Sequence, residues 1–173
     1  MKTIVDVSIL KQYQSTGTRA GGVKESLTIV DKYLNRVRTI VSNFKGHSLP
    51  ACVLAAIALR ESRCGAMLDD NGYGDRGHAY GICQIDERYH ITIGSPDSVE
   101  HIAQCDDILI GFFLEIKKKH NSWPEERQLQ GAIAAYNVGV ANIKTIEGID
   151  IGTTHDDYSN DVWAMANYLT GLI

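Results

Sequence analysis

Long apolar runs are missing from this 173-residue chain. The longest ones, such as residues 51–59, fall far short of the roughly 18 to 20 residues that a membrane-spanning helix requires, so no transmembrane segment is predicted. Basic clusters are equally scarce. The longest is Lys117 to Lys119, and 21 acidic against 17 basic residues give a formal net charge of −4. Nucleic-acid grooves and membrane-surface helices need basic patches, so neither is expected, and nucleic acid and membrane are excluded as main partners.

A secretory signal is not evident at the start of the chain. Residues 1–10 carry one basic residue and then an apolar run that Asp6 interrupts, without a small-residue cleavage site behind it. Two interpretations stay open: a protein that starts in the cytoplasm, or a mature form that begins with an added Met1.

Metal-binding motifs are also absent. The 4 cysteines, Cys52, Cys64, Cys83 and Cys105, form no CxxC pair and no Cys/His spacing of the zinc-ribbon kind. We therefore expect no structural metal. Buried thiols that pack as small hydrophobic groups and one or two disulfides both remain compatible with this cysteine count.

What is present is the pattern of one helical domain. The chain is 44% hydrophobic and long enough to bury roughly 70% of its unfolded surface. Apolar residues step by three and four along residues 23–44 and 102–116, which predicts amphipathic helices. Residues 51–61, apolar on every side until Arg60, predict a core helix that opens at Ser48 and Pro50.

Two further helices are predicted from their ends. Ser122 with Glu125 and Thr154 with Asp157 make capping-box patterns, and Gly139 closes the first of these helices. The glycine-rich stretch 72–81, followed by the alternating residues 82–86, predicts a short hairpin. We expect a mainly α domain over residues 23–173, after an irregular lead-in over residues 1–22.

Glu61 is the most informative single residue, because an apolar helix that ends in a carboxylate places that group at the edge of the core. Desolvation there would raise the pKa of Glu61 and keep it protonated near neutral pH, as a general acid requires. The alternatives are an ion pair with Arg60 or Arg63, or a helix end that simply reaches water.

Asp75 and Asp86 lie in the glycine-rich hairpin, where glycines let the backbone approach a ligand closely. A glycoside hydrolase uses two carboxyl groups in different environments, one a buried acid and one a solvated base or nucleophile. Glu61 with Asp75 or Asp86 would provide that asymmetry, although aspartates in turns are often structural.

Five ordered motifs carry a resemblance to a known family. They are residues 60–65 (RESRCG), 72–77 (GYGDRG), 80–86 (YGICQID), 135–139 (AYNVG) and 150–158 (DIGTTHDDY). In this order and spacing the chain resembles the goose-type (g-type) lysozymes from about Val23 to its C-terminus.

The resemblance implies a lysozyme-like α+β fold, with a small hairpin beside the active-site cleft. The activity that it implies is hydrolysis of the β-1,4 bond between N-acetylmuramic acid and N-acetylglucosamine in peptidoglycan. It implies Glu61 as general acid, Asp75 and Asp86 as the carboxylates that hold and activate water, an inverting course, and no cofactor. The sugar contacts that it implies are Gln84, His90, Tyr136, Asn137 and Tyr158.

The resemblance also implies partners and a place of action. We expect an extracellular monomer that binds peptidoglycan or N-acetylglucosamine oligosaccharides in defence or digestion, with a proteinaceous lysozyme inhibitor as a further partner. The resemblance implies no disulfide here, because the cysteines lie outside the family's disulfide positions; since Cys64 and Cys83 flank the proposed catalytic segments, a bridge between them is suggested by position alone and would hold Glu61 against the hairpin. One alternative is a lytic transglycosylase, which forms anhydromuramoyl products. The other is a non-catalytic peptidoglycan- or chitin-binding protein, and the presence of Glu61 and the two aspartates argues against it.

Overall fold

Helices make up most of the structure, a computed structural model that describes residues 4–74 and 77–173. In chain order the elements are η1 (Val7–Lys11), α1 (Gly22–Thr39), α2 (Val41–Phe44), α3 (Ala51–Ser62), β1 (Ala79–Tyr80), β2 (Ile85–Asp86), α4 (Val99–Lys119), α5 (Glu125–Val138), η3 (Val140–Asn142), η4 (Thr154–Asp156) and α6 (Tyr158–Leu169). The predicted fold class, mainly α with a small hairpin, is confirmed.

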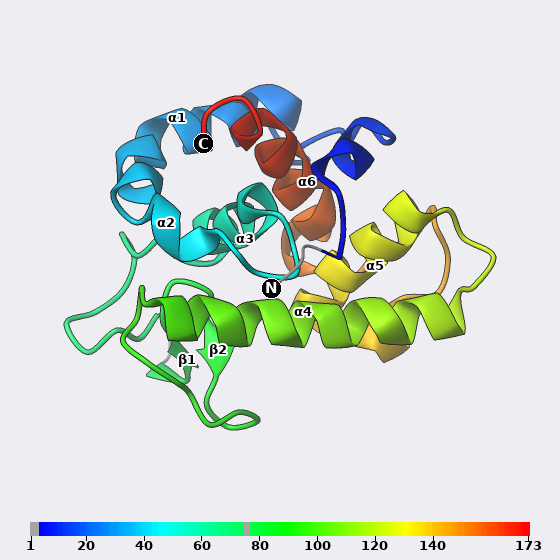
Figure 1. Ribbon diagram of the computed structural model, residues 1–173. Coiled ribbons are helices and arrows are strands. Elements are labelled where there is room, and N and C mark those ends of the chain that lie inside the picture. Colours follow the sequence, from blue (N-terminus) through cyan, green and yellow to red (C-terminus); the bar gives the residue numbers. More distant parts are fainter. Residues whose placement is uncertain (1–3, 75–76) are drawn as a thin grey trace.

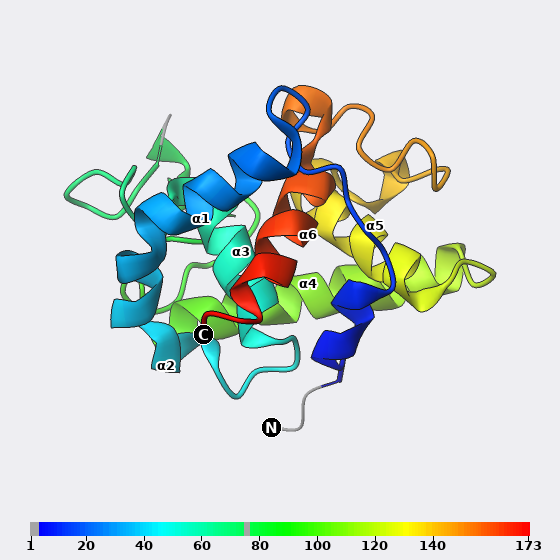
Figure 2. The same cartoon turned by 90° about the horizontal axis from the view of Figure 1, so that it is seen from above.

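Helix α3 is the centre of the molecule, as its apolar sequence predicts. Every residue from Cys52 to Leu59 is buried, and α3 packs along α6, which in turn contacts α1 and α5 (Figures 1 and 2). The helix begins directly after Pro50 and ends at Ser62, because Arg63 adopts a left-handed conformation with φ of 54°. Glu61 therefore stands in the last turn of a buried helix.

The predicted stripe over residues 23–44 forms two helices instead of one. Val30, Val37 and Phe44 are buried along it, but the backbone leaves the helical conformation at Ile40, where φ is −117° and ψ is 20°. Helix α2 turns there toward the loop that leads into α3.

Helices α4 and α5 pack along each other. Ser98 caps α4 by accepting a hydrogen bond from the His101 N–H, and three lysines fill its last turn, where cations interact favourably with the helix dipole. The predicted capping box before α5 is wrong: Pro124 is the N-cap residue and makes no side-chain cap bond, whereas Gly139 ends this helix as expected.

The start of α6 also differs from its predicted capping box. Asp157 precedes the helix but makes no cap bond, because its carboxylate accepts bonds from Arg60 and from the Arg19 N–H. Asp150 takes over instead: its two carboxylate oxygens accept the Ser159 and Asn160 N–H groups at 2.8 and 2.9 Å. A loop residue thus caps α6 from outside the expected motif.

Strands β1 and β2 form an antiparallel hairpin in which Ala79 pairs with Asp86 and Tyr80 with Ile85. This hairpin lies beside one end of α4 in Figure 1.

The N-terminal lead-in includes the 3-10 helix η1 and is attached to α6, since the Trp163 indole N–H bonds to the carbonyls of Leu10 and Tyr13 at 3.1 and 2.9 Å. Over residues 4–74 and 77–173, no helix is long and apolar enough to cross a membrane.

Candidate active site

Glu61 is partly buried between α3 and α6. The Tyr158 hydroxyl donates a hydrogen bond of 2.5 Å to Glu61 Oε1. Burial raises the pKa of Glu61 from 4.5 to about 7, and the bond from Tyr158 and the charge of Arg60 only partly oppose this rise. A carboxyl group that keeps its proton near neutral pH is suited to general-acid chemistry.

Arg60, the neighbour of Glu61, is committed to other carboxylates. Its guanidinium donates to Asp161 Oδ2 at 2.7 Å and to Asp157 Oδ1 at 2.8 Å. The Arg63 guanidinium donates to the Leu59 carbonyl at 3.0 Å. Within the described residues neither arginine forms an ion pair with Glu61, so the ion-pair alternative is not what the structure shows.

A cavity of about 670 Å³ opens beside Glu61. One wall comes from the lead-in and the start of α1, the other from the ends of α3 and η4. Its lining residues are Thr18, Arg19, Ala20, Glu25, Ile29, Arg60, Glu61, Arg63, Met67, Thr154, His155, Asp156, Asp157 and Asp161. Glu61 therefore lines a space that is large enough to admit a ligand.

The hairpin carries Asp86 in a charged environment. The Arg88 guanidinium donates two hydrogen bonds to this carboxylate, from Nε to Oδ1 at 3.0 Å and from Nη2 to Oδ2 at 2.7 Å. This pairing lowers the pKa of Asp86 to about 2. Asp86 is therefore ionised at a pH at which Glu61 is still protonated. The two carboxyl groups have the opposite protonation states that glycoside hydrolysis uses. Asp75, the other predicted carboxylate, lies outside the described residues.

Side-chain hydrogen bonds within the protein hold three of the other predicted sugar contacts, Gln84, Tyr136 and Asn137. Gln84 donates from Nε2 to the Ala79 and Gly81 carbonyls at 3.2 and 3.0 Å. Tyr136 donates to the Cys83 carbonyl at 2.6 Å, and Asn137 Oδ1 accepts the Thr154 N–H at 3.0 Å. His90 is exposed in the turn after β2.

The structure joins only some of the predicted site residues directly. Glu61 and Tyr158 are bonded to each other, and Tyr136 bonds to the loop between β1 and β2, in which Gln84 lies and bonds to Gly81. Among the residues described, Asp86 and His90 form no hydrogen bond with Glu61 or Tyr158.

Asp161 is a site residue that the sequence analysis missed. It is buried, binds Arg60, and accepts a 2.7 Å bond from the Ser26 hydroxyl of α1. A signal existed in the sequence: Asp161 directly precedes Val162, within the apolar face of the last predicted helix, where a lone carboxylate needs a partner.

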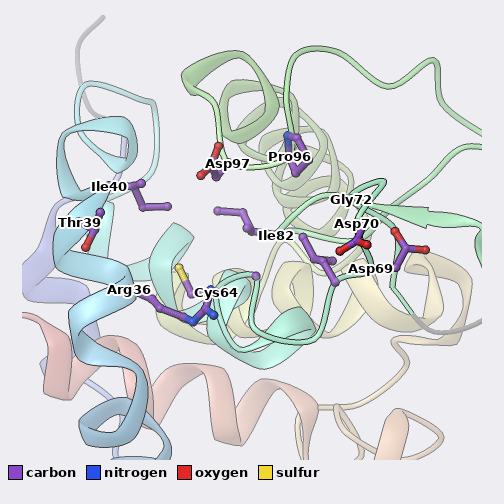
Figure 3. Close-up of a pocket in the computed structure, with 12 residues that line it drawn as sticks. Arg36, Thr39, Ile40, Cys64, Asp69, Asp70, Gly72, Ile82, Pro96 and Asp97 are labelled. Carbon is purple, nitrogen blue, oxygen red and sulfur yellow. The ribbon is translucent and has the colours of Figure 1, made fainter.

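The four cysteines are buried free thiols. Of the two interpretations that the sequence left open, the structure therefore has the buried thiols, and the bridge suggested between Cys64 and Cys83 is absent from it. The hydrogen bond of the Cys83 thiol goes to Cys105. Cys64 instead faces a separate pocket of about 400 Å³ between α1 and the loop after α3 (Figure 3). Burial raises the pKa of Cys64 to about 12, which makes this thiol unreactive.

Over residues 4–74 and 77–173, no cluster of histidine, cysteine and acidic residues is arranged to hold a metal ion.

Comparisons with a family model and with known proteins point to the same family. A family model described as "Lysozyme g" matches residues 6–171. Lysozyme g of Gallus gallus is 42% identical over 151 residues, which cover 85% of this chain and 71% of the relative. Lysozyme g of Casuarius casuarius is 44% identical over 138 residues, 78% of this chain and 73% of the relative. A glycine, glutamate and proline-rich protein of Lottia gigantea is 47% identical over 159 residues, 86% of this chain but 38% of the relative. The chain therefore belongs to the lysozyme g family and is a glycoside hydrolase of the lysozyme type.

Proposed function

We propose that this lysozyme hydrolyses the β-1,4 bond between N-acetylmuramic acid and N-acetylglucosamine with Glu61 as the general acid. The observation that carries the proposal is the environment of Glu61, where burial raises the pKa to about 7 beside an open cavity. Because the Tyr158 hydroxyl donates to Oε1, the acidic proton belongs on Oε2. That oxygen then protonates the glycosidic oxygen as the bond breaks.

The attacking water needs an anionic partner on the other face of the sugar. Asp86 supports this role because Arg88 holds it ionised. A pKa of about 2 makes Asp86 a weak base, so it is suited to orient water, while Asp75 is proposed to share the activation of that water. Because water itself attacks the face opposite the leaving group, with no covalent glycosyl-enzyme intermediate, this hydrolysis is proposed to proceed with inversion.

Substrate binding is proposed for Gln84, His90, Tyr136 and Asn137. Three of these side chains are already oriented by bonds within the protein, and such pre-ordering reduces the entropy lost on binding. Tyr158 is buried and its hydroxyl is bonded to Glu61, which supports a role in orienting the acid.

The first test is Glu61→Gln against Glu147→Gln, which changes an exposed carboxylate in the loop after η3. Glu61→Gln should abolish release of soluble fragments from purified peptidoglycan without loss of oligosaccharide binding, whereas Glu147→Gln should keep full activity. Full activity of Glu61→Gln would refute the assignment of the acid.

The second test separates hydrolysis from transglycosylation. Digestion of peptidoglycan in heavy-oxygen water should place one heavy oxygen in each new reducing end, as mass spectrometry would show. Anhydromuramoyl products without the label would favour a lytic transglycosylase, and intact peptidoglycan would favour a non-catalytic binding protein.

The place of action and the assembly are also proposed. Peptidoglycan lies outside the bacterial membrane, which favours an extracellular enzyme. We further propose that the enzyme works as a monomer and that its open cavity admits a proteinaceous inhibitor.

A further inference from the structure

Three helices fasten the loop between β1 and β2. From α3, the Ser62 hydroxyl donates to the Ile82 carbonyl at 2.8 Å. From α5, Tyr136 donates to the Cys83 carbonyl at 2.6 Å. From α4, His101 Nε2 accepts the Cys83 N–H at 3.0 Å. The two polar groups of Cys83 are thus each held by a side chain from a different helix.

His101 is the unusual member of this set. It is completely buried in the first turn of α4. Its ring packs so closely on Gly81 that a Cβ atom there would lie 2.2 Å from Cε1, and the Tyr80 ring meets it edge-on at 5.8 Å. Packing from two sides leaves the imidazole one position, with Nε2 at the Cys83 amide.

The bond fixes the chemical state of the imidazole. Nε2 can accept the Cys83 N–H only if it carries no proton, so the neutral ring carries its proton on Nδ1. Burial lowers the pKa of His101 to about 4, although the charge of Asp97 acts in the opposite direction. The lowered pKa keeps the ring neutral. No described group accepts the Nδ1 proton. Burying an unpaired donor is unfavourable, and an apolar ring of similar size would avoid that cost, so the acceptor on Nε2 is what distinguishes a histidine here.

The position of Cys83 links this bond to the proposed catalytic groups. Ser62 follows Glu61 directly in α3, and Asp86 follows Cys83 by three residues in β2. A shift of the Cys83 peptide would therefore move Asp86 relative to Glu61. Small errors in the placement of reacting groups have large effects on turnover.

We propose that His101 is a positioning residue for the lysozyme reaction, which holds the Cys83 peptide so that Asp86 keeps its place opposite Glu61. This inference rests on the proposed roles of Glu61 and Asp86. It assigns to α4 a part in catalysis, although the described lining of the cavity beside Glu61 includes no residue of α4.

The test compares two substitutions of the same residue. His101→Gln keeps a neutral acceptor near the place of Nε2, whereas His101→Phe keeps a ring but removes the acceptor. With peptidoglycan fragments as substrate, His101→Phe should lower kcat by roughly tenfold or more with little change in KM. His101→Gln should restore most of that loss.

His47→Phe is the matched control, because His47 is another buried histidine that bonds to a backbone carbonyl, in the loop between α2 and α3. It should lower Tm but leave kcat unchanged. Wild-type kcat in folded His101→Phe, or a loss that folded His101→Gln does not restore, would overturn the proposal.

A measurement on the unmodified enzyme needs no variant to fold. Nitrogen NMR at neutral pH should show His101 with its proton on Nδ1, and the Cys83 amide should exchange slowly with solvent. A proton on Nε2 would overturn the proposal. Activity retained in Glu61→Gln would instead refute the proposed function, so the two failures are distinguishable.

Discussion

At the scale of single residues, the bond between Tyr158 and Glu61 opposes the effect of burial. A hydroxyl that donates to a carboxylate favours its ionised form, so Tyr158 holds the pKa of Glu61 below the value that burial alone would give. The same bond fixes which carboxyl oxygen keeps the proton. Tyr158 thus sets both the acidity and the orientation of the proposed acid.

Replacing Tyr158 with phenylalanine should therefore change the pH profile. The alkaline limb of kcat/KM reports the protonated acid and should lie near pH 7 in the wild type. In Tyr158→Phe it should move upward by about one pH unit, the effect of one lost bond to a charged group. Activity measured between neutral and alkaline pH checks this.

Tyr168→Phe is the control, since Tyr168 on the same helix donates to Asp31 at 2.8 Å, away from Glu61. Its alkaline limb should match the wild type. An unchanged or lowered limb in Tyr158→Phe would contradict the assignment of Glu61.

At the scale of elements, Arg60 connects α3 to α6. Its guanidinium bonds to two carboxylates of low exposure, Asp157 and Asp161, and Asp161 also receives the Ser26 hydroxyl of α1. Three helices thus meet at one ion cluster beside the cavity. The cluster keeps the end of α3, and with it Glu61, at a fixed place against α6.

Removing the cation should be strongly destabilising, because it would leave two buried carboxylates without a counter-charge, although each would keep a hydrogen bond from an uncharged donor. Arg60→Met should lower the free energy of unfolding by roughly 3 to 5 kcal/mol. Arg19→Met breaks the exposed pair with Asp156 and should cost less than about 1 kcal/mol. Urea unfolding of both variants measures the difference, and equal losses would show that Arg60 has no special structural role.

At the scale of the whole molecule, two groups whose pKa values are shifted by burial make stability depend on pH in opposite directions. The pKa of Glu61 rises from 4.5 to about 7 on folding, so the folded state binds more protons in that interval and stability falls as pH rises through it. The pKa of His101 falls from 6.5 to about 4, so stability falls as pH decreases from 6.5 to 4.

Glu61→Gln removes the first of these effects. Its Tm should exceed that of the wild type at pH 8, where the partly buried carboxylate is ionised, and should approach the wild-type value near pH 4. Thermal unfolding at both pH values measures this. A constant difference in Tm would mean that ionisation of Glu61 does not affect stability.

Much of this architecture could be predicted from the sequence, because long stripes of apolar residues specify helices locally. The position of Glu61 was predictable for the same reason, since an apolar run ends beside it. The capping of α6 was not: the predicted box of Thr154 with Asp157 does not form, because Asp157 is engaged by Arg60, distant in sequence, and Asp150 caps the helix. The thiol partners were equally unpredictable, because the packing of α4 decides that Cys83 meets Cys105.

The bonds from Trp163 to the lead-in place a natural fluorophore at a structural junction. The chain has 2 tryptophans, and they occupy different surroundings. Trp163 is buried with its indole N–H bonded to Leu10 and Tyr13, whereas Trp123 is only partly buried and stacks on His120 at 3.9 Å. Detachment of the lead-in would expose the Trp163 indole to water while leaving the Trp123 stack intact. Emission from a Trp123→Phe protein therefore reports directly on the segment that walls the cavity beside Glu61.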